Sequence, residues 1–399
     1  MRSILTALFI FVLLLAGCAD SDVQQLEREG LFELELGKLD DQIDLFQLED
    51  SNTRFRNRIA SRDGRIYISN GNASKIMEFT GYGDLLTLLY DPIVNPQPIL
   101  PESAESGTMT RRAVSHQFET LGEIALGDGR GVLIEDRLQD GGDFDDDLGV
   151  RLRSRVLRFN SGQYVDYIGQ EGVGGSPFPY IEALEVTAND EIVVITRTGS
   201  GRRVFWYSPE GELRWEVPIS DDRLPVPDDG TEVVPALDAV YPDLEQQRLY
   251  LKLDYYERLP VEGGQVEGGQ REIGDIYSRI FVLDLQDGVY SHAVDVPEQT
   301  VEDRLPPDFE PQEVPYLYRF VGVGPNGHLY LAARDSDDSQ ELLILRDSGR
   351  VVGRRRITIE DEPLYELDLS VSPEGILVGL LGREDSALVA WWRTDRLID

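Results

Sequence analysis

Residues 58–79 read RIASRDGRIYISNGNASKIMEF, and this stretch decides the fold. Short runs rich in Ile, Tyr, Met and Phe are separated by two turns of small and polar residues, at Asp63-Gly64 and at residues 70–74. Such runs are typical of β-strands joined by tight turns. A further apolar run at residues 84–90 supplies a last strand, so the unit is a four-stranded sheet.

The same unit recurs five more times along the chain. Its turns are marked by Gly with Asp, Asn, Ser or Pro, and its strands by apolar runs such as residues 192–196 and 342–345. These runs do not alternate apolar with polar residues, which indicates sheets that are buried on both faces. Six four-stranded units in one chain predict an all-β fold, a six-bladed β-propeller.

The sixth unit lacks room for its fourth strand, because the chain ends soon after the strand at residues 387–392. Two N-terminal runs alternate apolar with polar residues, 31–36 and 43–48, and either could complete this sheet. Joining the two ends of the chain removes exposed strand edges and ties the ring shut. We therefore expect residues 31–399 to form a single propeller domain.

The start of the chain has the layout of an export signal. Arg2 precedes an apolar stretch from Ile4 to Ala16. A membrane span needs roughly 20 apolar residues, whereas this shorter stretch suits the apolar region of a secretory signal. Residues 1–17 are therefore predicted to be cleaved, and residues 18–30 to form an acidic tether.

The sequence Leu15-Ala16-Gly17-Cys18 resembles the lipobox of bacterial lipoproteins, and it contains the only cysteine of the chain. The resemblance implies cleavage between Gly17 and Cys18, acylation of Cys18, and attachment to a lipid bilayer of the cell envelope, at the periplasmic face or the outer membrane. The alternative is an ordinary secretory signal with a chance cysteine.

The first repeat also carries a resemblance. Residues 63–79 resemble an NHL-type repeat, and NHL-like and TolB-like propellers usually have six blades, in agreement with the count of units. The same repeat, with its continuation to residue 98, is similar to certain spirochaetal lipoproteins of unknown function.

Composition excludes several classes of function. The 399 residues include 74 acidic and 38 basic side chains, a formal net charge of −36. Affinity for phosphate backbones comes from clusters of Lys and Arg, so this charge argues against a nucleic-acid partner. A single cysteine excludes intramolecular disulfides and cysteine-based zinc sites.

The connections after the second and fourth strand of each unit are long and acidic, and propeller geometry places them on one rim. Function concentrates on loops held by a rigid scaffold, so this rim is the predicted binding face for a protein or peptide partner. The alternative is that these long loops vary in sequence without any role in binding. The acidic residues singled out for binding are Asp143, Asp145, Asp147, Asp303, Asp308 and Glu310.

Carboxylates at alternate positions suit calcium, which takes six to eight oxygen ligands. The predicted metal-ligating set is Asp335, Asp337, Ser339 and Glu341. The aspartates at 143–147 are a second set, but they depart from an EF-hand loop, because Leu148 stands at the glycine position. We nevertheless favour a solvated acidic loop and expect no cofactor, with a calcium site as the alternative.

The sequence shows no catalytic constellation, so we expect a membrane-tethered, non-catalytic binding or scaffold module for an envelope protein or peptide. The alternative is a metal-dependent, calcium-type propeller hydrolase or lactonase, with inner-strand carboxylates around one ion in the channel. A quinone-dependent dehydrogenase would need a catalytic histidine in the channel. Of the three histidines, only His328 is near a suitable turn. The discriminating feature is whether three or more carboxylates meet on the axis, and the candidates are Glu123, Glu182, Glu185, Asp238 and Asp368.

Overall fold

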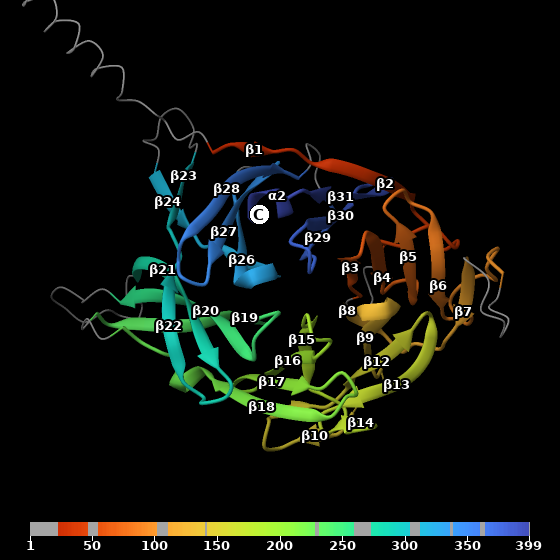
Figure 1. The fold of residues 1–399 in the computed structure, drawn as a ribbon, viewed down its shortest axis with the longest axis horizontal. Helices are drawn as coiled ribbons and strands as arrows, with labels where there is room; N and C mark the ends of the chain where they lie inside the picture. The colour runs from red at the N-terminus through yellow and green to blue at the C-terminus, as the bar shows by residue number, and fades with distance from the viewer. Residues whose placement is uncertain are drawn as a thin grey trace, which may run out of the picture.

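Six β-sheets stand around a central axis, which confirms the predicted all-β, six-bladed propeller (Figure 1). The computed structural model describes residues 23–46, 55–101, 111–139, 142–227, 231–258, 273–303, 312–335, 338–359 and 364–398. Within these ranges, no helix is both long and apolar enough to cross a membrane. The one α-helix among them is the short α2 (Asp395–Ile398).

Each blade has four antiparallel strands that lie side by side from the axis outward. Blades 1 to 3 are β3 (Asn57–Arg62), β4 (Arg65–Asn70), β5 (Lys75–Thr80) and β6 (Leu85–Tyr90); β8 (Leu121–Gly127), β9 (Gly131–Arg137), β12 (Ser154–Asn160) and β13 (Gln163–Gly169); and β15 (Tyr180–Val186), β16 (Ile192–Thr198), β17 (Gly201–Tyr207) and β18 (Leu213–Ser220). Blades 4 to 6 are β19 (Val233–Pro242), β20 (Arg248–Arg258), β21 (Ile273–Asp284) and β22 (Tyr290–Asp295); β25 (Arg319–Gly324), β26 (His328–Arg334), β27 (Ser339–Arg346) and β28 (Val351–Thr358); and β29 (Glu366–Val371), β30 (Leu377–Gly382), β31 (Ser386–Trp392) and β2 (Glu29–Glu35).

The N-terminal strand β2 closes the ring as the outermost strand of blade 6. It pairs antiparallel with β31, with Glu29 opposite Trp391 and Glu35 opposite Ser386. The first of the two predicted closing segments is therefore the correct one. In the second, Ile43 makes only an isolated bridge to Leu36 and is fully buried.

Residues expected to act as a tether also touch the propeller. The short strand β1 (Gln25–Leu26) pairs in parallel with β28 of blade 5. In blade 1, which adjoins blade 6 on its other side, β7 (Arg112–Ser115) pairs in parallel with β6. Both segments cover strand edges that would otherwise be open for pairing with another chain.

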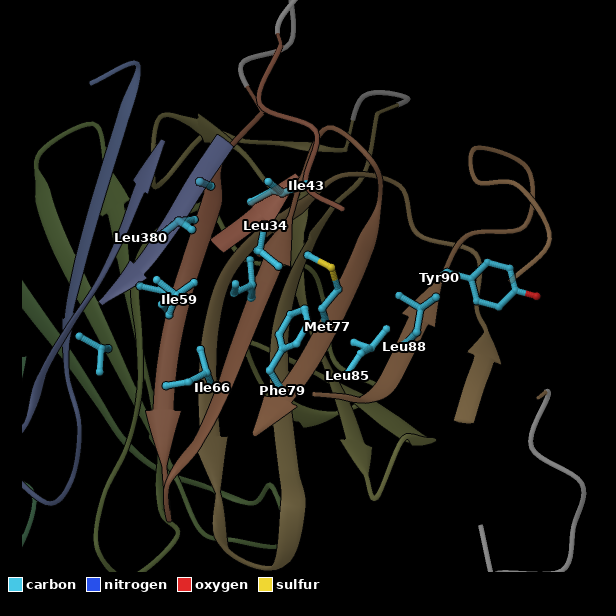
Figure 2. Close-up of a cluster of buried hydrophobic side chains, with 14 of the residues drawn as sticks. Leu34, Ile43, Ile59, Ile66, Met77, Phe79, Leu85, Leu88, Tyr90 and Leu380 are labelled. Carbon is cyan, nitrogen blue, oxygen red and sulfur yellow. The ribbon is translucent and has the colours of Figure 1, made fainter. Parts of the chain in front are cut away.

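Apolar side chains from neighbouring blades meet between the sheets, as Figure 2 shows for the seam of blades 6 and 1. There Leu34 of β2 and Leu380 of β30 belong to one cluster with Ile59 and Ile66 of blade 1. Tyr67, the next residue along β4, belongs to the cluster between blades 1 and 2. Because successive residues point to opposite faces and both faces are covered, the strands read as continuous apolar runs.

The long-loop rim contains more strand than the sequence pattern predicts. β10 (Phe144–Asp145) pairs with β11 (Val150–Arg151), and β23 (Gln299–Asp303) pairs with β24 (Gln312–Tyr316). β14 (Gly172–Val173) adds a further edge to blade 2. These strands are polar and lack the apolar runs from which strands were predicted, so they were expected to be loops.

Candidate active site

The six inner strands β3, β8, β15, β19, β25 and β29 surround a cavity of about 210 Å³ on the propeller axis. Four of the five predicted inner-strand carboxylates line it, so the condition that three or more carboxylates meet on the axis is fulfilled. The polar and charged side chains around the cavity belong to Arg58, Glu123, Glu182, Glu185, Tyr241, Arg319, Asp368 and Ser370.

One side of the channel, which we call the paired side, consists of Arg58, Glu123 and Asp368. The Arg58 guanidinium donates from Nε and Nη2 to the two Glu123 oxygens at 2.8 and 2.9 Å. It also donates from Nη1 to Asp368 Oδ1 at 3.2 Å. Burial opposes the charge of Arg58, but Glu123 and Asp368 together raise its pKa above the ordinary value. The guanidinium is therefore a fixed cation between two carboxylates.

Further donors complete the paired side. Arg56 Nη1 donates to Glu123 Oε1 at 2.7 Å, and the backbone N–H of Ile59 donates to Asp368 Oδ2 at 2.8 Å. Burial nevertheless raises the pKa of Asp368 to about 6, against the opposing effects of Arg58 and of that N–H group. Asp368 is thus ionised at neutral pH but takes a proton in mildly acidic solution.

A fully buried glutamate supports this side from behind. Glu135 Oε2 accepts from the Glu123 backbone N–H at 3.2 Å, and Glu135 Oε1 accepts from Ser154 Oγ at 2.8 Å. Burial raises the pKa of Glu135 to about 7, with the Glu123 charge adding to the shift and Arg137 opposing it. These bonds fix the backbone that carries Glu123.

β-Bulges place two further carboxylates on the inner strands. The register shifts around Glu182 in β15 and around Asp238 in β19, and a bulge re-aims the extra side chain. Each is paired within its own blade, since Arg202 holds Glu182 at 2.9 and 3.1 Å and Lys252 Nζ lies 3.0 Å from Asp238 Oδ2. Asp238 does not line the cavity, so the expectation that it converges with the others is wrong.

The opposite side of the channel, which we call the open side, consists of Glu185, Tyr241 and Arg319. These residues come from β15, β19 and β25 in three successive blades. Their side chains form no hydrogen bond or ion pair with any other residue that the structure describes. The open side therefore has donors and an acceptor available for a ligand.

Glu185 is the titratable group of the open side. Burial raises the pKa of its carboxyl to about 8, and the negative charge of Glu123 adds to the shift. Burial and the nearby Glu185 likewise raise the pKa of Tyr241. At neutral pH the Glu185 carboxyl is protonated and the Tyr241 phenol is neutral, so both can donate hydrogen bonds.

The channel carboxylates do not fit a calcium ion. Calcium takes six to eight oxygens, yet Glu123 and Asp368 already share Arg58, and Glu182 is held by Arg202. Over the described parts of the chain, no three His, Cys, Asp or Glu side chains are grouped to hold a metal. We derive no chemistry through a channel metal, because Arg58 occupies the place between the carboxylates.

The rim residues predicted for binding are described only in part. Asp145 Oδ1 accepts from the Leu148 backbone N–H at 2.9 Å, which is a turn contact. Asp143 and Asp147 flank it on the same small hairpin. Only the backbone of Asp303 in β23 is described, and Asp308 and Glu310 fall outside the described residues. Their role at the rim stays a prediction.

The predicted metal ligands that the structure describes are bonded to other side chains. Asp335 accepts from Arg356 and from Ser339 Oγ, and Glu341 accepts from Tyr318 and lies 3.2 Å from Arg354 Nε. Asp337 falls outside the described residues, so calcium at this place stays a prediction.

Two further residues of the sequence analysis have clear outcomes. His328 is buried at the start of β26, where its Nδ1 lies 2.6 Å from the Pro325 carbonyl oxygen, and it does not line the axial cavity. The dehydrogenase alternative therefore lacks its channel histidine. Cys18 falls outside the described residues, so its acylation stays a prediction.

The cavity also contains residues that the sequence analysis missed, namely Arg58, Tyr241 and Arg319. Arg58 lies in the first predicted strand, so its place could have been found from the sequence. Tyr241 and Arg319 lie outside the apolar runs from which strands were predicted, and neither a cation nor a phenol is a typical metal ligand.

No protein-family model matches the chain, and no curated protein does. Among solved structures it is similar to a gluconolactonase from Xanthomonas campestris, with 10% identity, a TM-score of 0.39, and coverage of 92% of this chain and 97% of the other. It is similar to a glucose dehydrogenase to the same degree, covering 91% of this chain and 98% of that one.

The expectation of a non-catalytic binding module is wrong. The channel supplies the physical reason, because four carboxylates meet on the axis and the pKa values of Glu185 and Asp368 lie on either side of neutrality. Pairs of titratable groups with separated pKa values are typical of acid–base catalysis.

Proposed function

We propose that this protein is a hydrolase that cleaves a small ester or lactone in the central channel of the propeller. The observation that carries the proposal is the Glu185 carboxyl, which faces the axial cavity without a partner among the described residues while the neighbouring carboxylates are held by arginines. A buried acid that no structural contact uses is a candidate for proton transfer.

Glu185 and Asp368 divide the proton transfers between them. Asp368, with a pKa of about 6, is ionised at neutral pH and accepts a proton from the attacking water. The water oxygen bonds to the acyl carbon while the bond from that carbon to the leaving oxygen breaks. Glu185, with a pKa of about 8, gives its proton to the leaving oxygen.

Tyr241 stabilises the charge that develops during this reaction. Its hydroxyl lines the same cavity and is kept neutral by burial, so it donates a hydrogen bond to the carbonyl oxygen as negative charge accumulates there. The packing of its ring against Phe320, with the centroids 4.8 Å apart, holds the phenol in place.

The test is a panel of short-chain esters and γ- and δ-lactones, followed by titration of the released acid. We expect turnover by the wild type and a loss of about 100-fold or more in Glu185→Gln. Glu182→Gln is the matched control on the same strand, since Glu182 is held by Arg202. The proposal fails if no member of the panel is cleaved, or if the two variants lose activity equally.

We also propose that the chain is anchored in the cell envelope through an acylated Cys18. The support is the lipobox-like sequence alone. In cells, Cys18→Ser should move the protein from the membrane fraction to the soluble fraction while leaving hydrolysis unchanged. Retention of the variant in the membrane fraction would contradict the anchor.

A further inference from the structure

The open side of the channel has its positive charge at one end and its uncharged donors at the other. Arg319 is the first residue of β25 and is exposed, whereas Glu185 and Tyr241 are next to last in β15 and β19. Pairing relates these positions, because Glu185 lies opposite Val193 and Val323 lies opposite Leu329, each the second residue of its strand. Arg319 lies opposite Ala332, three residues beyond Leu329, because a bulge takes up one residue of β25. At roughly 3.3 Å per residue, the Arg319 backbone is thus about 10 Å from the level of Glu185.

The balance of charge around the cavity favours an anionic ligand. Each ionised carboxylate there is paired with a guanidinium: Asp368 with Arg58, Glu182 with Arg202, and Glu123 with both Arg58 and Arg56. Arg319 is left without a carboxylate among the described residues, although the chain as a whole carries a net charge of −36. A surplus guanidinium at the start of a polar cavity is suited to bind a carboxylate.

Beyond Glu185 the channel continues into a second cavity of about 70 Å³, which shares Glu185, Leu184 and Ser370 with the first. Its other walls include Ser61, Leu126 and Leu244. Glu185 thus lies between the cavity that contains Arg319 and a smaller one that has room for a short substituent.

We propose that the substrate is an ester or lactone with an anionic group, which Arg319 binds, and a short group at its other end, which enters the smaller cavity beyond Glu185. This inference rests on the proposed function for the scissile bond, but the anion site stands on the cavity and its charges alone. A substrate of this kind would place its carbonyl beside Glu185 and Tyr241 when both ends are bound.

The first experiment compares two esters of equal chain length with the full-length protein. Monoethyl glutarate carries one carboxylate, and diethyl glutarate is neutral. We expect the wild type to prefer the monoester by about 10-fold or more in kcat/KM, because a hydrogen bond between charged groups is strong enough to give such a factor. Arg319→Gln should abolish this preference, whereas Arg258→Gln, at a rim arginine paired with Glu232, should retain it.

The second experiment measures binding without catalysis. Glutarate, but not glutaramide, should raise the thermal midpoint of the wild type, and Arg319→Gln should lose the response. If both esters resist hydrolysis while glutarate still binds through Arg319, the proposed function fails and the anion site stands. If the esters are cleaved equally well and Arg319→Gln changes neither rate nor midpoint, the anion site is refuted and the hydrolase stands.

Discussion

The paired and open sides of the channel are built from the same kinds of residue, yet they are suited to different tasks. On the paired side, Arg58 joins Glu123 and Asp368 through three hydrogen bonds. On the open side, Glu185, Tyr241 and Arg319 have no such bonds within the described residues. Bonded charges stabilise the ring, whereas unbonded polar groups in a cavity are available to a ligand.

Removing the arginine of each side should give the largest contrast. Arg58→Met leaves the partly buried Asp368 without its cation and removes one of the two guanidinium groups from Glu123, so it should lower the free energy of unfolding by about 3 kcal/mol. Arg319→Met breaks no ion pair with a described residue and should change it by less than about 0.5 kcal/mol. Denaturant unfolding of both variants checks this, and equal losses would remove the distinction between the two sides.

Removing the phenol of the open side should affect the reaction and leave the fold intact. Tyr241→Phe keeps the ring packed on Phe320 but loses the donor, so kcat should fall by about 100-fold with an unchanged thermal midpoint. Steady-state kinetics and a melting curve on the same sample test this. A lower midpoint with normal kcat would make Tyr241 a structural residue.

Glu185→Gln should alter how stability depends on pH. The pKa of Glu185 is raised from 4.5 to about 8 in the folded protein, so its contribution is fully present below pH 4.5 and is lost as pH rises through about 8. Relative to the wild type, the variant should therefore gain stability between pH 5 and pH 9. A constant difference across this range would show that Glu185 is not buried as described.

The smallest expected effect concerns divalent cations. Calcium and manganese should leave the channel of the wild type unoccupied, because Arg58 holds Glu123 and Asp368. Arg58→Ala frees Asp368 and leaves Glu123 with Arg56 alone, so either ion should raise the thermal midpoint of that variant. An equal rise in both proteins would point instead to a rim site such as that predicted around Asp335.

The sequence predicted the fold because apolar runs and glycine turns repeat six times, and because one N-terminal segment had the alternation of an edge strand. It also placed Glu123, Glu182, Glu185 and Asp368 on inner strands. It could not show that three of these four are neutralised by arginines, because Arg58 and Arg202 contact them only when the sheets form and close. The bulge that re-aims Glu182 has no signature in the apolar pattern.

The pH dependence of kcat/KM for the best ester is the sharpest test of proton transfer by Asp368 and Glu185. We expect a bell-shaped profile, with an acid limb near pH 6 from Asp368 and an alkaline limb near pH 8 from Glu185. The residual activity of Glu185→Gln should retain the acid limb and lose the alkaline one. A wild-type profile that is flat from pH 5 to pH 9, or an alkaline limb that persists in the variant, would contradict this assignment.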